Sequence, residues 1–406
     1  MQRTNIVELK PSKRQKKILQ EMMLLSSCVY NMANYEVRQS FFKEEKCPSF
    51  FDLQKKLQTK EDYQLLGRSY ALPRVQIYGE TNSARFKLIK SKSQKKVGLP
   101  KYLKNRKSNT TIPSYLVIDG CQYGLSKTKA SLPLSRQMRK KYDLKSFKID
   151  YNGVLKHKGK QQRGQIHFKN GKFYLYQSVE FIEPKPKSSG VVSGVDFGIK
   201  RLFAVKISTG QELVVGSKRH FKQFMHYNDL ISKEQGRLAL VNRKYSKRLS
   251  KLFEVRAKWQ KNLYDNLVAK VFRFLNRHNV DTVFVGNVKG VREDKDWGCK
   301  GNSMLHNYWT YETLYQKYKN KAEEHGIRME KQEEAYTSRT CPICGIEEAS
   351  HKKDRLFICS FCEYVDDRDI VGATNIMFKG MHDLSNRSVH QGETAHLGGI
   401  LYGIES

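Results

Sequence analysis

The sequence has no apolar run long enough to span a lipid bilayer and no pattern typical of a secretory signal peptide. Half of its eight cysteines are scattered singly, at Cys28, Cys47, Cys121 and Cys299. Isolated cysteines indicate reduced thiols and not a disulfide framework. These absences exclude membrane-spanning and secreted proteins from our expectation. They predict an intracellular protein, cytoplasmic or nucleoid-associated if the source is prokaryotic.

Acidic residues are scarce relative to basic ones. The chain has 40 Asp and Glu against 75 Lys and Arg, which gives a formal net charge of +35 at pH 7. A charge so far from zero exceeds what solubility requires and indicates a polyanionic partner, above all nucleic acid. With 406 residues, the chain is long enough for roughly two to four compact units.

The remaining cysteines form two C-x-x-C pairs, Cys341 with Cys344 and Cys359 with Cys362. Two such knuckles present four thiolates, the ligand set of a closed tetrahedral zinc site. The segment between the pairs is slightly shorter than the usual ribbon spacing but long enough for the knuckles to face each other. We therefore predict a structural zinc ribbon over residues 341–362, which contributes to folding and leaves no open position for chemistry.

Three separated carboxylates accompany this zinc unit. Asp196 lies in an apolar, β-branched strand far upstream, Glu334 comes just before the first knuckle, and Asp369 comes just after the second. Acids from distant segments that converge on one site are suited to binding Mg²⁺ for phosphodiester hydrolysis. The zinc unit then has the position of an insertion between the last strand and the last helix of a catalytic domain.

The segments GVDFGIK, YTSRTCPICG, CSFC and RDIVGATNI resemble the RuvC-type nuclease half of the TnpB (OrfB) family. These transposon-encoded proteins are relatives of the type V CRISPR effectors and of the Fanzor proteins. The resemblance is specific from Val191 to about Lys379, and over the N-terminal half only the layout matches. It implies a guide RNA that selects double-stranded target DNA by base pairing, next to a short flanking motif that the protein reads.

The resemblance also implies a site and a mechanism. Asp196, Glu334 and Asp369 would hold two Mg²⁺ ions, one to activate water and one to stabilise the leaving oxygen. The expected assembly is a monomer, with a dimer as the alternative.

The chain departs from the commoner family pattern in the strand Asp281–Val288. Most RuvC-like members place a catalytic Glu at the end of this strand, where this chain has Gly286 followed by Asn287. Glycine has no side chain with which to ligate a metal. Either the nuclease is inactive or another acid takes the place of the missing one.

Glu334 is the predicted substitute. In an RNase H-like sheet the strand of Asp196 borders the strand of Gly286, which borders the strand Arg328–Ala335. Moving the carboxylate over by one strand displaces its backbone by about 5 Å, a gap that a Glu side chain can bridge in front of a glycine.

The spacing to the zinc unit supports this choice. Some TnpB proteins and the Fanzor proteins have a Glu seven residues before the first zinc cysteine, and Glu334 stands at that distance from Cys341. Glu333 and Glu330 are the alternatives, although a regular strand would point Glu333 to the opposite face.

At the other end of the zinc unit we favour Asp369 over Asp366 and Asp367. Gly372 and Ala373 are small enough for a helix to pack closely on the sheet, and Asp369 lies about one turn earlier on the same face. The last acid of the family also aligns with Asp369. We expect Asp366 and Asp367 in the turn before the helix, where they favour its N-terminus.

The predicted fold class is α+β and multidomain. Short β segments, with a hairpin turn at Asn170-Gly171, surround a long helical pattern in the N-terminal half. This layout resembles the wedge β-barrel of the family, interrupted by a helical recognition lobe. The predicted parts are a wedge-like β-barrel (1–10 and 108–183), a helical recognition lobe (11–107), a linker (184–190), an RNase H-like (RuvC) α/β nuclease (191–340 and 363–379), the zinc ribbon (341–362) and a flexible tail (380–406).

The stretch from Ala84 to Lys107 is basic, contains no Asp or Glu, and has two interleaved aromatic residues. It predicts phosphate contacts to RNA or DNA, with a solvated face as the alternative. Arg339, just before the first knuckle, is predicted either to contact the scissile phosphate or to be structural. The candidate nucleic-acid contacts are Lys87, Lys90, Lys95, Lys96, Lys101, Tyr102, Lys104, Arg106 and Arg339.

The favoured function is therefore an RNA-guided, Mg²⁺-dependent DNA endonuclease of the TnpB type. A nuclease-dead, RNA-guided DNA-binding repressor is one alternative, and Gly286 is its main support. A guide-free transposase or resolvase with a RuvC-like fold is the other, and the long basic N-terminal half argues against it.

Overall fold

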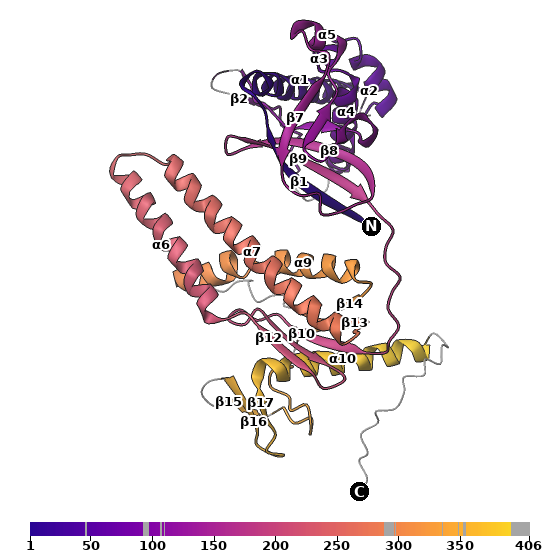
Figure 1. Cartoon of the computed structure of the whole chain (residues 1–406). Helices are drawn as coiled ribbons and strands as arrows, with labels where there is room; N and C mark the ends of the chain where they lie inside the picture. The colour runs from indigo at the N-terminus through magenta and orange to yellow at the C-terminus, as the bar shows by residue number, and fades with distance from the viewer. Residues whose placement is uncertain are drawn as a thin grey trace. The chain divides into compact units, whose positions relative to one another are not determined.

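The computed structural model describes residues 1–44, 47–91, 97–105, 108, 110–287, 296, 298–334, 336–347, 349–351 and 355–390. The chain divides into two compact units, Met1–Ile182 and Glu183–Ser406, each with its own apolar core (Figure 1). Both units combine helices with strands, so the predicted α+β, multi-unit class is confirmed. Within the described ranges, no helix has the length and apolar character that crossing a membrane requires.

The first unit combines a seven-stranded antiparallel sheet with a group of helices. The sheet has the order β4-β8-β9-β1-β7-β6-β5, and β2 pairs with β3 in a separate two-stranded sheet. Helices α1 to α4 follow β1 and precede the other strands of the large sheet, in the order expected of a helical insertion. The elements are β1 (Gln2–Lys10), α1 (Lys13–Glu44), α2 (Phe50–Leu57), α3 (Glu61–Leu66), α4 (Arg68–Lys90), β2 (Lys104–Asn105), β3 (Thr110–Thr111), β4 (Leu116–Ile118), the short 3₁₀ helix η1 (Gly120–Gln122), β5 (Gly124–Leu125), β6 (Lys129–Leu132), α5 (Arg136–Lys141), β7 (Phe147–Asn152), β8 (Lys160–Lys169) and β9 (Lys172–Glu180).

Residue alternation determines which face of this sheet is buried. In β7, Phe147, Ile149 and Tyr151 are buried and the residues between them are exposed. The hairpin between β8 and β9 turns at Asn170 and Gly171, whose φ angles of 52° and 79° fit a two-residue turn with both central residues left-handed. The hairpin predicted at this Asn-Gly pair is therefore confirmed.

The second unit contains a five-stranded mixed sheet with the order β12-β11-β10-β13-β14. Strands β10, β13 and β14 run parallel, and β11 and β12 add an antiparallel hairpin to the β10 edge. The predicted neighbour order, with the Gly286 strand between the other two, is confirmed. The elements are β10 (Val192–Asp196), β11 (Phe203–Ile207), β12 (Glu212–Val215), α6 (Lys218–Leu240), α7 (Lys247–Arg277), β13 (Thr282–Asn287), α8 (Gly298–Asn302), the π-helix η2 (Ser303–Tyr308), α9 (Tyr311–Glu324), β14 (Arg328–Glu333), β15 (Ala349–His351), β16 (Leu356–Cys359), β17 (Val365–Asp367) and α10 (Arg368–His390).

Helices cover both faces of this sheet (Figure 1). Val195, Val283 and Val285 pack with apolar residues of α7 and α9 on one face. Val192 and Phe284, which point the other way, pack with α10. Because side chains alternate along a strand, position 196 shares the α10 face with Val192.

Glycines allow α10 to approach the sheet closely. A Cβ at Gly194 would lie 2.0 Å from the carbonyl oxygen of Ala373, and a Cβ at Gly372 would lie 3.3 Å from Oδ2 of Asp196. The predicted close packing at Gly372 and Ala373 is therefore confirmed. It places the first turns of α10 directly against the end of β10.

Two expectations about the C-terminal part are wrong. Asp366 and Asp367 lie in β17 and not in a turn, because Val365–Asp367 pairs with Leu356–Ile358 and thereby satisfies its backbone groups. Residues 380–390 belong to α10 and not to a flexible tail. Met381 and Leu384 pack against the cluster of Val192 and Phe284, which extends the helix. The remaining predicted tail, 391–406 with His396, lies outside the described residues.

The predicted linker is bound to the second unit along part of its length. The Lys187 N–H donates to the carbonyl of Gly326 (3.0 Å), and the Gly190 N–H donates to Oδ2 of Asp281 (2.6 Å). Lys187 and Gly190 are therefore anchored to the second unit.

The close approach of α10 leads to a stability prediction. In Gly194→Ala the new methyl group meets a backbone atom that cannot move alone, so we expect a loss of about 1–3 kcal/mol in the free energy of unfolding, or more. Gly236 in α6 is the control, because nothing lies within 4 Å of its Cβ position. Gly236→Ala should gain about 0.5–1 kcal/mol. Urea unfolding measures both, and equal effects would contradict the close packing.

Candidate active site and cysteine cluster

Asp196 and Gly286 lie side by side at the ends of parallel strands. Val195 pairs with Val285, so the next residue on each strand is Asp196 or Gly286. Gly286 pairs in turn with Gln332 on β14. Glu334, two residues after Gln332, returns to the same face of the sheet.

The Glu334 carboxylate occupies the space that a side chain at position 286 would need. A Cβ at Gly286 would lie 1.9 Å from Oε1 of Glu334 and 2.6 Å from its Cδ. That Oε1 is buried and has no hydrogen-bond partner among the described residues. Glu333 is exposed and pairs with Asn287, while Glu330 forms an ion pair with Arg328 at 3.4 Å. Of these three candidates, Glu334 is the one directed over Gly286.

Burial makes both Asp196 and Glu334 costly to ionise. Burial, with a contribution from Asp369, raises the pKa of Asp196 to about 7. Burial, with a contribution from Asp196, raises the pKa of Glu334 to about 8. Two half-buried carboxylates, one of which has an oxygen without a hydrogen-bond partner among the described residues, form a site that a cation would stabilise in the ionised form.

Asp369 lies in the first turn of α10 and is held by two arginines. Arg355 forms an ion pair and hydrogen bond with its Oδ2, and Nη1 of Arg201 lies 3.6 Å from the same oxygen. Its backbone N–H donates to Oδ1 of Asp367 at 3.0 Å. Burial raises the pKa of Asp369, and Arg355 acts in the opposite direction.

The three acids do not form a compact ligand set in this structure. Among the described residues, only the four cysteines place three or more potential ligand atoms within 4.8 Å of one another. Asp196 and Glu334 are neighbours, whereas Oδ2 of Asp369 is engaged by Arg355. Joint coordination of one ion requires Asp369 to exchange that contact.

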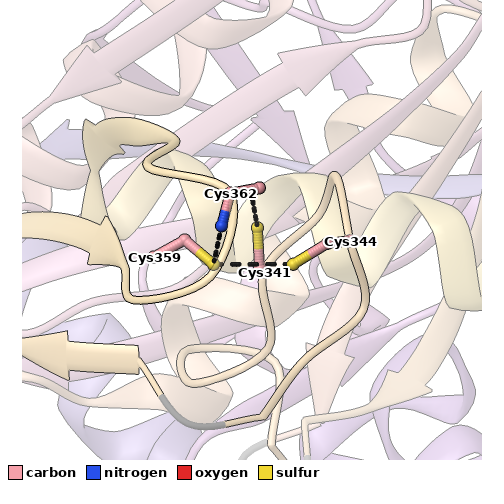
Figure 2. A group of neighbouring side chains, drawn as sticks. All are labelled: Cys341, Cys344, Cys359 and Cys362. Atoms are coloured by element: carbon pink, nitrogen blue, oxygen red, sulfur yellow. Dashed lines mark hydrogen bonds between the residues drawn. The ribbon is translucent and has the colours of Figure 1, made fainter.

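The four cysteines converge on a common point (Figure 2). The Sγ atoms of Cys341 and Cys362 are 3.6 Å apart, and those of Cys344 and Cys359 are 3.5 Å apart. Four thiolates at about 2.3 Å from one tetrahedral ion would be about 3.8 Å apart. The cluster therefore fits a tetrahedral metal ion.

Backbone groups prepare one of these thiols for ligation. The N–H groups of Cys362 and Phe361 point to Sγ of Cys359 at 3.5 and 3.4 Å. Their hydrogen bonds lower the pKa of Cys359 to about 6. Strand β17 extends the small sheet of this unit beyond Cys362, the predicted end of the ribbon.

Comparison with known proteins agrees with this arrangement. The OrfB family model, described as a probable transposase, matches residues 173–292, and the model of the Cas12f1-like TNB domain matches residues 311–376. The TnpB-like protein ORF457 of Acidianus two-tailed virus is 27% identical over 420 aligned positions, which cover 93% of this chain and 87% of that protein. This chain is a TnpB-type relative of the type V CRISPR effectors.

The chain is also similar to CRISPR effector proteins, over shorter alignments or at lower sequence identity. Cas12f1 of Syntrophomonas palmitatica is 25% identical over 199 residues, covering 47% of the TnpB-type chain and 39% of the effector. The fold is similar to Cas12f1 in a complex with sgRNA and target DNA, with a TM-score of 0.56 and 16% identity over 90% of this chain and 83% of that one. It is also similar to the mini-RNA-guided endonuclease CRISPR-Cas_phi3, with a TM-score of 0.51 and 9% identity over 93% and 92%.

Asn375 in the ATNI segment positions the loop that carries Glu334, a role that the sequence reasoning missed. Its Nδ2 donates to the carbonyls of Thr337 (2.7 Å) and Thr340 (2.8 Å). Thr337 in turn donates from its N–H and hydroxyl to the carbonyl of Glu334, at 3.2 and 3.0 Å. The only sequence signal for this clamp was the matched motif itself.

The predicted nucleic-acid contacts remain predictions. Lys87 and Lys90 are exposed in the last turn of α4, and Lys101 and Lys104 are exposed after it. Tyr102 is 37% exposed, and the Arg38 guanidinium covers its ring with its centre 4.8 Å from the ring centroid. Arg339 is also exposed. Lys95, Lys96 and Arg106 lie outside the described residues.

Removing one thiol tests the cysteine cluster. Cys344→Ser should reduce the zinc content of the purified TnpB-type chain from about one ion per chain to nearly none, because three ligands do not complete a tetrahedral site. Elemental analysis by mass spectrometry measures the content. Cys121→Ser is the control, since Cys121 is an exposed thiol outside the cluster. Equal zinc in both variants, or none in the wild type, would refute the site.

The raised pKa of Glu334 predicts a pH-dependent stability in buffer without added Mg²⁺. Its folded pKa of about 8 exceeds the ordinary value of 4.5, so between these values the folded state binds more protons. The free energy of unfolding should therefore fall as pH rises through this window.

Glu334→Gln removes the ionisable carboxyl group and, with it, the fall in the free energy of unfolding at high pH. We expect its unfolding midpoint to exceed that of the wild type by about 2–4 °C at pH 8, for a gain of about 1 kcal/mol, and to equal it near pH 4.5. Added Mg²⁺ should raise the midpoint of the wild type more than that of the variant at pH 8. Parallel pH profiles in thermal unfolding would show that Glu334 is not a buried acid.

Proposed function

We propose that this chain is an RNA-guided, Mg²⁺-dependent DNA endonuclease of the TnpB type. In this proposal the second unit is an RNase H-like (RuvC) nuclease domain, and the first is a wedge-like β-barrel with a helical recognition lobe. The observation that carries the proposal is the carboxylate of Glu334 over Gly286, beside Asp196. A relocated acid at this point restores the carboxylate that position 286 lacks.

The acids fit a hard divalent cation. Carboxylate oxygens are the ligands that Mg²⁺ prefers, and Oε1 of Glu334 is a buried oxygen with no hydrogen-bond partner among the described residues. Asp196, Glu334 and Asp369 would hold the ions, and the family resemblance implies two of them. When bound, Mg²⁺ would supply an activated water and neutralise charge on the phosphodiester.

The protein's own groups prepare this site in three ways. Asn375 holds the loop that carries Glu334 against α10. The glycines at 194 and 372 let α10, which carries Asp369, pack closely on the face of the sheet that carries Asp196. Arg355 neutralises Asp369, and a divalent cation bound by Asp369 would have to replace that contact.

Guide RNA and double-stranded target DNA are the proposed partners. The net charge of +35 favours a polyanionic partner, and the fold resembles Cas12f1, which was determined in complex with sgRNA and target DNA. The proposed zinc ion in the four-cysteine cluster has a structural role, because the cluster has no open position.

Two observations favour the nuclease-dead repressor as a second candidate. Gly286 removes the commoner acid, and Arg355 occupies Oδ2 of Asp369. If these features are permanent, the protein binds its target without cutting it.

Cleavage of a guide-matched plasmid in Mg²⁺ decides between the two. Glu334→Gln should reduce the cleavage rate by about two orders of magnitude or more, because a metal ligand is lost. Glu333→Gln is the matched control and should cleave like the wild type, since its side chain is exposed on the other face.

An exchange of positions sharpens this test. Glu334→Gly combined with Gly286→Glu returns the carboxylate to the commoner strand and should recover part of the activity that Glu334→Gln lacks. A wild type that binds the matched plasmid but never cuts it would support the repressor. Copurification without any RNA of defined length would instead favour a guide-free enzyme.

A further inference from the structure

A cationic cavity of about 590 Å³ lies in the second unit, next to the candidate acids. Five basic side chains from three separate segments line it. Lys200 and Arg201 follow β10, Lys218 and Arg219 begin α6, and Arg355 comes just before β16. No carboxylate is among the described residues that line this cationic cavity.

Two of the five cations connect the cavity to the acids. Arg201 forms ion pairs with Asp367 and Asp369, and Arg355 forms one with Asp369. Because Asp369 faces the same end of β10 as Asp196, a chain that crosses the acids would pass the cavity.

The other three cations have no counter-charge of their own. Lys200, Lys218 and Arg219 form no ion pair within the described ranges, and all three are exposed. Gathering like charges around one cavity is unfavourable unless an anion enters it. The arginine guanidinium fork and the lysine ammonium group are both suited to phosphate oxygens.

We propose that the cationic cavity is a subsite for one backbone phosphate of a nucleic-acid strand, adjacent to the phosphodiester at the acids. The inference rests on the proposed function, because the strand is the expected substrate. Within the described part of the chain, the lining offers no aromatic ring on which a base could stack and no carboxylate that would repel a phosphate. Its cations come from three segments of the chain and line one cavity, which favours a single phosphate.

The test measures binding without cleavage. The guide-bound protein, in buffer without added Mg²⁺, is titrated into a fluorescein-labelled single-stranded oligodeoxynucleotide that does not match the guide. Fluorescence anisotropy gives the dissociation constant at several KCl concentrations. The test variant is Lys218→Ala/Arg219→Ala, which removes two exposed side chains and leaves the pairs of Arg201 and Arg355 in place.

The control variant removes the same charge elsewhere on the same helical hairpin. Lys233→Ala/Lys244→Ala removes two exposed lysines that form no ion pair within the described ranges. Lys233 lies fifteen residues after Lys218 along α6, a rise of about 22 Å, and Lys244 lies beyond the end of the helix.

We expect the test variant to bind about three- to tenfold more weakly. Its slope of log affinity against log salt should be smaller by about 0.7, the value for one lost phosphate contact to a single strand. The control should change affinity less than twofold. Equal losses in both variants, or no loss in the test variant, would overturn the subsite.

Residue-resolved protection supplies a second readout on the wild type. The oligonucleotide should protect Lys200 and Lys218, but not Lys233, from acetylation measured by mass spectrometry. Equal labelling with and without the oligonucleotide would refute the subsite. If the protein never cleaves DNA but the binding results hold, the nuclease proposal fails alone. If it cleaves and the test variant binds and cuts like the wild type, only the subsite fails.

Discussion

The candidate site depends on the packing of the Glu334 side chain against Gly286 on the neighbouring strand. Gly286 has no side chain, and the carboxylate of Glu334 occupies the volume that a Cβ would need. Neither residue explains the site alone. A glycine at the end of a buried strand leaves a gap beside Asp196, and a glutamate on the next strand closes it with an oxygen that lacks a hydrogen-bond partner within the described ranges. The cost of that arrangement is visible in the raised pKa values of both acids.

Helix α10 connects the segments that surround Glu334 and Gly286. Its first turn presents Asp369, its small residues pack against β10, and Asn375 holds the loop of Glu334. The cysteine unit joins the same helix through β17, and its Arg355 reaches Asp369. A structural metal in the cysteine cluster would therefore order a segment that contacts the candidate active site, although the cluster itself has no place for substrate.

Local sequence patterns predicted the parts of the site that depend on strand periodicity and spacing. The β-branched runs at Asp196 and Gly286 predicted strands. The resemblance to the TnpB family predicted that these strands are adjacent and that Glu334, by its spacing from Cys341, faces them; the catalytic role of that acid stays a prediction. Features that depend on contacts between distant segments could not be predicted in this way. The ion pair of Arg355 with Asp369 and the clamp of Asn375 on the Thr337 loop arise only when the segments are brought together. The composition of residues 380–390, rich in Ser, His and Gly, led to the wrong prediction of a flexible tail. Two apolar residues in this segment, Met381 and Leu384, pack against the sheet and extend α10.

Glu334 and Asp196 are proposed to share an ion across Gly286. The decisive measurement is a crystal structure of the guide-bound protein with Mn²⁺ in place of Mg²⁺, with the ions located by anomalous scattering. We expect an ion about 2.0–2.2 Å from an oxygen of Glu334 and from an oxygen of Asp196. Manganese held by Asp196 and Asp369 alone, with the Glu334 carboxylate directed away from it, would show that the two acids do not share an ion.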